Sequence, residues 1–185
     1  IAESSAAGQS AGMQQYFQQE RDNACRDALA IAAKRSAALY PDAELQAVMA
    51  LGAGADGRAT LWRYGYYSPA NGAYMSVDVG SFNTYLFAGD APPEASTRLP
   101  LPEPFVDSDA ILQKAESDGG AGFRALFPNE DVTLTVELGD LALPVRPAPP
   151  RVFWHVMYEA PIGTGSDTTL SLFYDAATGE KLNGT

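Results

Sequence analysis

One pattern occurs twice in this chain, and the repeat limits the possible folds more than any other feature. The stretch TLWRYGYYSP at residues 60–69 and the stretch VFWHVMYEAP at residues 152–161 place Trp, Tyr and Pro in the same order and spacing. Upstream of both stretches, identical residues recur without gaps, among them Asp22 and Asp109, Pro41 and Pro128, and Gly52 and Gly139. The chain therefore contains a duplicated unit of roughly 75 residues.

Each copy of the unit begins with a predicted helix. In the first copy, small and apolar residues recur at helical spacing between Ala24 and Leu39, and Tyr40-Pro41 ends the helix because the residue before proline avoids helical geometry. In the second copy, Ser108 is a plausible N-cap, and Gly119-Gly120 is expected to break the helix.

Strands are predicted after each helix, because apolar residues there alternate with other side chains. The alternating sets that we expect to face each helix are Leu45, Ala47, Met49 and Leu51; Val132, Leu134, Val136 and Leu138; Trp62, Tyr64 and Tyr66; Trp154, Val156 and Tyr158; Val77 and Val79; and Leu170 and Leu172. Core packing is the expected role of both tryptophans. One helix on a small antiparallel sheet, made twice, is an α+β architecture.

The composition along the chain divides it into four segments. Residues 1–12 are rich in small side chains and resemble a flexible tether, and residues 13–89 form the first unit. Residues 90–106 are rich in proline, which favours a stiff, extended linker. Residues 107–185 form the second unit. We expect superposition of the two units to place Trp62 on Trp154.

Three motifs of these units resemble the PepSY domain: YPDAEL at residues 40–45, the W-x-x-x-Y spacing after Trp62 and Trp154, and YDAATGEKL at residues 174–182. The first copy departs from this pattern, since SVDVG continues into SFNTYLF without an Asp-x-x-Thr-Gly turn. The resemblance implies two tandem cystatin-like units outside the cytoplasm. It also implies a link to inhibiting or chaperoning peptidases, and it supplies no catalytic residues.

Composition excludes several classes of partner and site. The formal charge is −11, with 23 acidic residues against 12 basic ones, so nucleic acid is a poor partner. Cys25 is the only cysteine, which excludes an intramolecular disulfide and a cysteine-cluster metal site. No apolar run reaches the length of a membrane span. The start at Ile1 leads us to expect that an export signal or anchor precedes the chain.

No local motif predicts a cofactor, a metal or a catalytic centre. The loop GAGADG at residues 52–57 matches a dinucleotide-binding pattern, but a strand is predicted to follow it where that fold needs a helix. Cys25 and His155 are predicted in different units, so a Cys–His dyad is not expected. We expect no zinc site, because the chain has one histidine and one cysteine.

The strand faces that point away from the predicted helices carry the candidate binding surface. Its four candidate residues are Arg63, Tyr67, His155 and Glu159. The favoured hypothesis is an exported, non-enzymatic binding or peptidase-inhibitory module that holds a protein or peptide. One alternative is a purely structural protein whose sheet faces pack together. Another is a hydrolase that uses a carboxylate pair not identifiable from the sequence.

Overall fold

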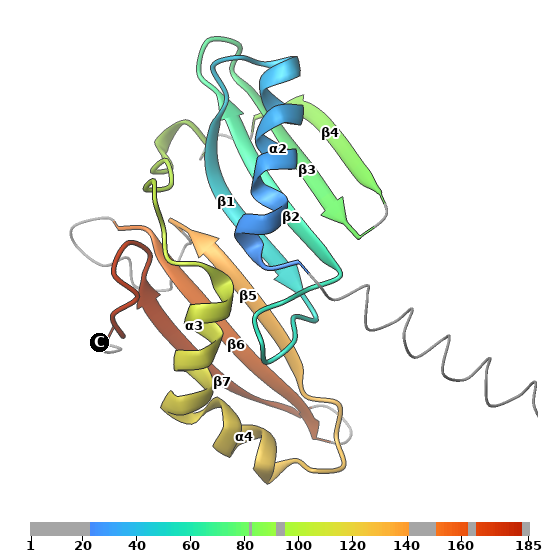
Figure 1. Ribbon diagram of the computed structural model, residues 1–185, viewed down its shortest axis with the longest axis vertical. Helices are drawn as coiled ribbons and strands as arrows, with labels where there is room; N and C mark the ends of the chain where they lie inside the picture. Colours follow the sequence, from blue (N-terminus) through green and yellow to red (C-terminus); the bar gives the residue numbers. More distant parts are fainter. Residues whose placement is uncertain (1–22, 82, 92–94, 141–150, 163–165, 183–185) are drawn as a thin grey trace, which may run out of the picture.

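The computed structural model describes residues 23–81, 83–91, 95–140, 151–162 and 166–182 (Figure 1). Its centre is one antiparallel sheet of seven strands in the order β4-β3-β2-β1-β5-β6-β7. The strands are β1 (Glu44–Leu51), β2 (Leu61–Ser68), β3 (Ala73–Gly80), β4 (Thr84–Asp90), β5 (Thr133–Gly139), β6 (Phe153–Ile162) and β7 (Ser166–Asp175). The tether predicted at residues 1–12 lies outside the described residues.

The fold predicted as two tandem cystatin-like units, each with its own small sheet, is wrong. Strand β1 of the first half pairs directly with β5 of the second half, with Val48 opposite Leu138 and Ala50 opposite Val136. This pairing turns both halves into one continuous, strand-rich sheet. An unpaired strand edge leaves backbone N–H and C=O groups without partners, and joining the two halves satisfies these groups.

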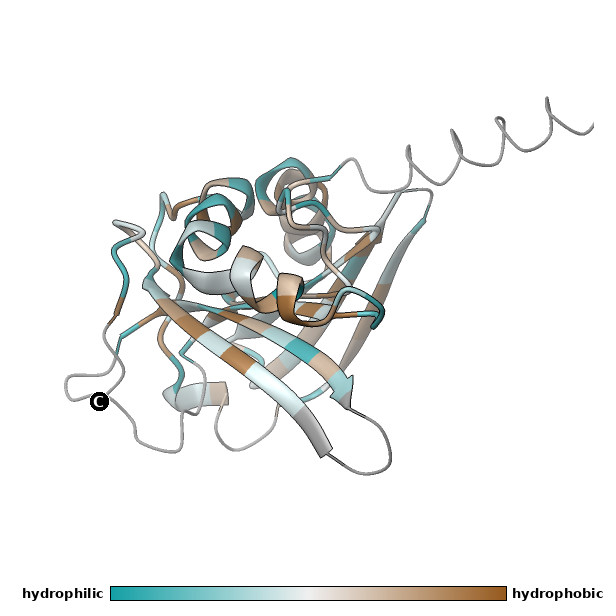
Figure 2. Ribbon diagram, turned by 90° about the horizontal axis from the view of Figure 1, so that it is seen from below, coloured by the Kyte–Doolittle hydropathy of each residue, from teal (hydrophilic) through white to brown (hydrophobic). Residues whose placement is uncertain are grey.

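The α- and π-helices of the described residues lie on one face of this sheet (Figures 1 and 2). They are α2 (Cys25–Leu39), α3 (Ser108–Ala115), the π-helical turn η2 (Glu116–Gly120) and α4 (Ala121–Leu126). Helix α2 presents a stripe of small buried side chains to the strands: Cys25, Ala28, Ala32 and Ser36. It ends before Tyr40-Pro41, as predicted. No helix of the described residues is long and apolar enough to cross a membrane.

The N-termini of α2 and α3 meet near the middle of the sheet. Ser108 Oγ accepts a hydrogen bond from Cys25 N at 2.9 Å, and Asp107 Oδ1 accepts one from Arg26 N at 3.1 Å. Asp107 is also the N-cap of α3, so the N-cap lies one residue before the predicted Ser108. A Cβ at Gly57 would lie 2.5 Å from Asp109 Cα. The GAGADG loop is therefore a β1–β2 connection that packs against α3.

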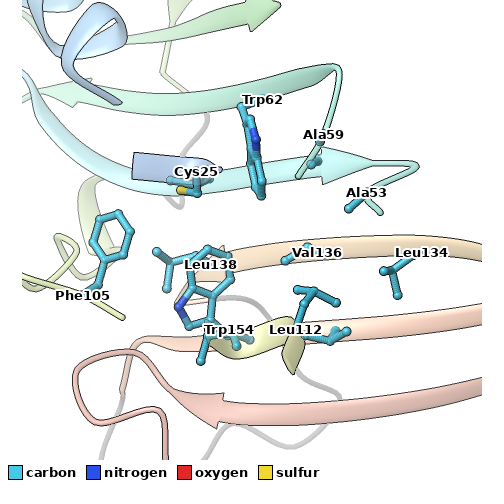
Figure 3. Close-up of a cluster of buried hydrophobic side chains, with 14 of the residues drawn as sticks. Cys25, Ala53, Ala59, Trp62, Phe105, Leu112, Leu134, Val136, Leu138 and Trp154 are labelled. Atoms are coloured by element: carbon cyan, nitrogen blue, oxygen red, sulfur yellow. The ribbon is translucent and has the colours of Figure 1, made fainter. Parts of the chain in front are cut away.

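Both tryptophans are core residues, as predicted, and both are fully buried on the helix side of the sheet. Trp62 Nε1 donates to the carbonyl of Asn23 at 2.8 Å, and Trp154 Nε1 donates to the carbonyl of Val106 at 2.9 Å. Each ring thus ties a strand to the segment that leads into the helix above it. Figure 3 shows both rings in one cluster with Leu138.

The prediction that alternate residues of β1 from Leu45 to Leu51 face the helix is wrong beyond Leu45. The pairing of β1 with β2 shifts between Leu45 and Ala47, so Gln46 forms a β-bulge. An extra residue reverses which side chains face the helix. Val48 and Ala50 are consequently buried, each with 1 % exposure, whereas Met49 lies on the opposite face.

The helix of the second copy is broken at Gly119, as predicted, but a further helix, α4, follows the break. Gly119 has φ 138°, a conformation that L side chains rarely adopt, and α4 starts two residues later. A Cβ at Gly120 would lie 2.2 Å from the hydroxyl of Tyr158. The two glycines therefore allow the kink and the close packing of the helix on β6.

The proline-rich segment packs against the sheet along part of its length. It contains the short 3₁₀-helix η1 (Ala95–Thr97), whose Ala95 carbonyl accepts a hydrogen bond from the Gln46 side chain at 2.9 Å. Leu101 N donates to the carbonyl of Leu45 at 2.9 Å, and Phe105 belongs to the core. The described part of this segment is thus anchored to β1 of the first half and, at Phe105 and Val106, to the second half.

Candidate binding face

The face of the sheet opposite the helices, here called the open face, contains a row of side chains that crosses every strand. Consecutive members of the row are register partners in neighbouring strands, so all of them lie on the same face. We call this set the cross-sheet row: Tyr85, Asp78, Arg63, Met49, Glu137, His155 and Phe173.

All four candidate residues lie on the open face, but they form two groups instead of one cluster. Arg63 and Tyr67 are on β2, whereas His155 and Glu159 are on β6. Strands β1 and β5 lie between them, which separates the groups by roughly 14 Å at the usual strand spacing. The four residues can therefore belong to one extended surface, and they do not form a compact pocket.

Arg63 makes the strongest ion pair of the open face. Its Nε and Nη2 atoms donate to the two carboxylate oxygens of Asp78, both at 2.7 Å. The Asp78 side chain is 7 % exposed, and that of Arg63 is 49 % exposed. The hydrogen bond to Asp78 raises the pKa of Arg63. This two-point contact fixes the guanidinium and leaves part of it available to a partner.

His155 is held in place by three neighbours on the second half of the open face. Its ring stacks on Phe173 with 4.6 Å between centroids and 10° between planes. His155 Nδ1 lies 3.5 Å from Glu137 Oε2, and Nε2 lies 3.2 Å from Ser171 Oγ. The imidazole therefore has a fixed orientation and a polar partner at each nitrogen.

Tyr67 and its neighbour Tyr74 lie opposite each other on β2 and β3. Tyr74 extends over Gly65, where an added Cβ would lie 2.1 Å from the Tyr74 hydroxyl. Burial raises the pKa of Tyr74, and nearby Arg98 and Arg63 act in the opposite direction. Aromatic rings and guanidinium groups therefore gather on this half of the open face.

The sheet separates Cys25 from His155. Cys25 is fully buried under α2 on the helix face, whereas His155 is on the open face. Burial raises the pKa of the Cys25 thiol well above its usual range, which disfavours the thiolate that a nucleophilic cysteine needs. Within the described ranges, no three His, Cys, Asp or Glu side chains are grouped to hold a metal ion.

Carboxylates come together on the helix side, in a groove lined in part by Asp56, Asp109 and Glu116. Glu116 is already engaged, because it accepts a hydrogen bond from the Tyr158 hydroxyl at 2.9 Å and pairs with Arg124. A second groove is lined by Asp118, which accepts a hydrogen bond from the Tyr174 hydroxyl at 2.9 Å and lies 3.7 Å from Lys181 Nζ. The bonded carboxylates therefore serve to anchor the η2 turn.

Sequence reasoning missed the edge strand β4. The stretch SFNTYLF was read only as a departure from the second copy, yet it begins the strand that ends the sheet. Three consecutive side chains of β4 are exposed despite being apolar or aromatic: Tyr85 by 54 %, Leu86 by 38 % and Phe87 by 56 %. The signal for a strand was present in the run of aromatic and apolar residues after a short turn.

The chain matches no protein-family model, no curated protein and no solved structure at a significant level.

Proposed function

We propose that the protein is a non-catalytic protein-binding module and that the open face holds its partner. The composition of this face carries the proposal, because protein interfaces are enriched in Tyr, Phe, Met and Arg and depleted in Lys. The face presents Met49, Arg63, Tyr67, Tyr74, His155, Met157 and Phe173. All three lysines of the chain lie elsewhere: Lys34 on α2, Lys114 on α3 and Lys181 after β7.

The charge of the chain indicates the chemistry of the partner. A net charge of −11 attracts basic proteins and repels acidic ones at a distance. On the open face, Glu159 and the partly exposed Glu137 offer carboxylates beside apolar side chains. A protein that presents basic and apolar residues together fits this surface. The resemblance to the PepSY domain makes a peptidase outside the cytoplasm the first partner to test.

The sheet keeps the Cys25 thiol apart from the His155 ring, which argues against a Cys–His dyad. The joining of the two halves also tests the alternative of a purely structural protein, in which the sheet faces of the two halves would pack against each other. Strands β1 and β5 meet through their edges, so the open surfaces of the halves lie side by side within one face. That arrangement favours binding over a purely structural role.

The test compares two double variants with equal net charge. Met157→Lys with Glu159→Lys makes the open face more basic, whereas Gln113→Lys with Glu130→Lys adds the same charge at exposed positions on α3 and after α4. Partners are captured from the secreted fraction of the parent organism, and peptidase inhibition is assayed in parallel. We expect capture and inhibition to be lost in the first variant and kept in the second. An unchanged partner profile in the folded open-face variant would rule this surface out.

A further inference from the structure

The outer strand β4 is a sheet edge, because it pairs with β3 on one side and with no other strand of the described residues. Figure 1 shows it at the end of the sheet opposite β7. Every residue from Tyr85 to Asp90 is exposed, and the strand contains no Pro, Lys or Arg. Natural edge strands usually carry such residues, because they prevent pairing with another chain. Their absence from a seven-residue edge indicates that this edge has a partner.

The hydrogen bonds at the two ends of the β3–β4 hairpin identify the free backbone groups. Gly80 N donates to Asn83 O at 2.8 Å, and Ala91 N donates to Gly72 O at 3.4 Å, so both are hydrogen-bonded pairs. Bonded and non-bonded pairs alternate along an antiparallel ladder. The outward-pointing N–H and C=O groups therefore belong to Thr84, Leu86, Ala88 and Asp90.

The side chains of β4 complement a second, antiparallel β4. With Phe87 at the centre, Tyr85 lies opposite Gly89 of the second copy, and Leu86 lies opposite Ala88 of the second copy. Large residues thus face small ones, and nothing lies within 4 Å of a Cβ built on Gly89. The terminal Asp90 lies opposite a threonine, so no like charges meet. A shift of two residues in either direction would leave the ends of the strand unpaired.

We propose that two copies of this chain form a symmetric dimer by antiparallel β4–β4 pairing centred on Phe87. The molecule already joins its own halves in this way, through antiparallel β1–β5 pairing with α2, α3 and α4 on one face. A two-fold axis perpendicular to the sheet continues the sheet across both copies and extends the open face. The dimer does not depend on the proposed binding function, and either can fail without the other.

Local charge opposes this pairing only weakly. Within the hairpin at residues 73–91, the charged side chains are Asp78, which is paired with Arg63, and Asp90. The net charge of −11 on each copy still repels the other copy at long range. Salt screens such repulsion, so the dimer should become tighter as ionic strength rises.

The first experiment measures self-association of the complete chain by sedimentation over a range of concentrations and salt. We expect a monomer–dimer equilibrium that shifts toward dimer in salt. Phe87→Lys places two like charges opposite each other and should raise the dissociation constant about tenfold or more. Ser171→Lys, which adds the same charge to an exposed position on β7, should leave it unchanged. A wild-type chain that stays monomeric at every concentration would overturn the proposal.

The second experiment tests the register by oxidative cross-linking of variants that each add one surface cysteine to the buried native Cys25. Phe87 and its copy form a non-hydrogen-bonded pair, whose Cα atoms lie at about 4.5 Å, within the range that a disulfide spans. Phe87→Cys should therefore yield a covalent dimer, whereas Leu86→Cys and the surface control Ser171→Cys should not. Cross-linking of Leu86→Cys in place of Phe87→Cys would contradict this register. Equal cross-linking of all three variants would contradict the interface.

Discussion

The two faces of the sheet differ although the same seven strands build both. On the helix face, one row of register partners is buried from β3 to β7: Val77, Tyr64, Val48, Leu138, Trp154 and Tyr174. The neighbouring cross-sheet row, one residue along each strand, holds ion pairs and partly exposed aromatics. The pleat sends alternate side chains to opposite faces, and helix coverage decides which of the two rows becomes core.

The largest loss of stability is expected from a substitution in the buried row of the helix face. Trp154→Ala should lower the free energy of unfolding by about 3–5 kcal/mol, because it empties a fully buried site and removes the hydrogen bond to Val106. Chemical denaturation of the variant measures this loss. A loss under about 1 kcal/mol would place the ring at the surface.

Most substitutions on the open face should change stability little, but a substitution of Arg63 should lower it measurably. Arg63→Ala leaves the buried Asp78 carboxylate without its partner and should cost about 1–2 kcal/mol, given that Arg63 itself is half exposed. Removing both charges with Asp78→Ala should recover part of the loss, which a double-mutant cycle can measure. Additive single effects would mean that the pair contributes nothing. Arg63 is therefore a poor choice for testing partner binding alone.

Alkaline pH should act mainly on the helix face, where four buried tyrosines lie. Burial raises the pKa of Tyr64, Tyr66, Tyr158 and Tyr174 above the usual value of 10.0. Above pH 10 the unfolded chain loses these protons while the folded chain keeps them, so stability falls as pH rises, by up to about 1.4 kcal/mol per pH unit for each tyrosine. Thermal unfolding between pH 8 and pH 11 measures this slope. Tyr64→Phe should make the slope shallower, and an unchanged slope would contradict the burial effect.

The smallest effect is expected at exposed positions of the open face. Ser171→Ala removes only a surface hydroxyl near the His155 ring, so stability should change by less than about 0.5 kcal/mol. The same denaturation assay applies. A loss above about 1 kcal/mol would contradict the surface role assigned to Ser171.

The sequence predicted local features well because each has a local cause. The stop before Pro41, the break at Gly119 and the burial of Trp154 follow from backbone restriction or alternation. The β1–β5 pairing could not be predicted, because the alternation of a strand is the same whether its edge is free or paired. The bulge at Gln46 was missed for a related reason, since one extra residue changes the facing of a strand without changing its composition.

The candidate surface was predicted in part. Alternation correctly separated Arg63 and His155 from the core, because each lies one residue from a buried tryptophan. Their partners Asp78 and Glu137 were missed, since the strand register that brings these residues together depends on the loops and on the joined sheet. The exposed strand β4 was missed because the described part of the second copy has only an isolated bridge, Tyr174 with Lys181, beside its last strand.

The joined sheet with two unlike faces is the central claim, and methyl NMR tests it most directly. We expect nuclear Overhauser contacts between the methyl groups of Val48 and Leu138, which are opposite each other across β1 and β5. A soluble paramagnetic probe should broaden the methyl signals of Met49 and Met157 on the open face and leave those of Val48 and Leu138 sharp. Absence of the Val48–Leu138 contact, with equal broadening of all four residues, would contradict the joined sheet and the difference between its faces.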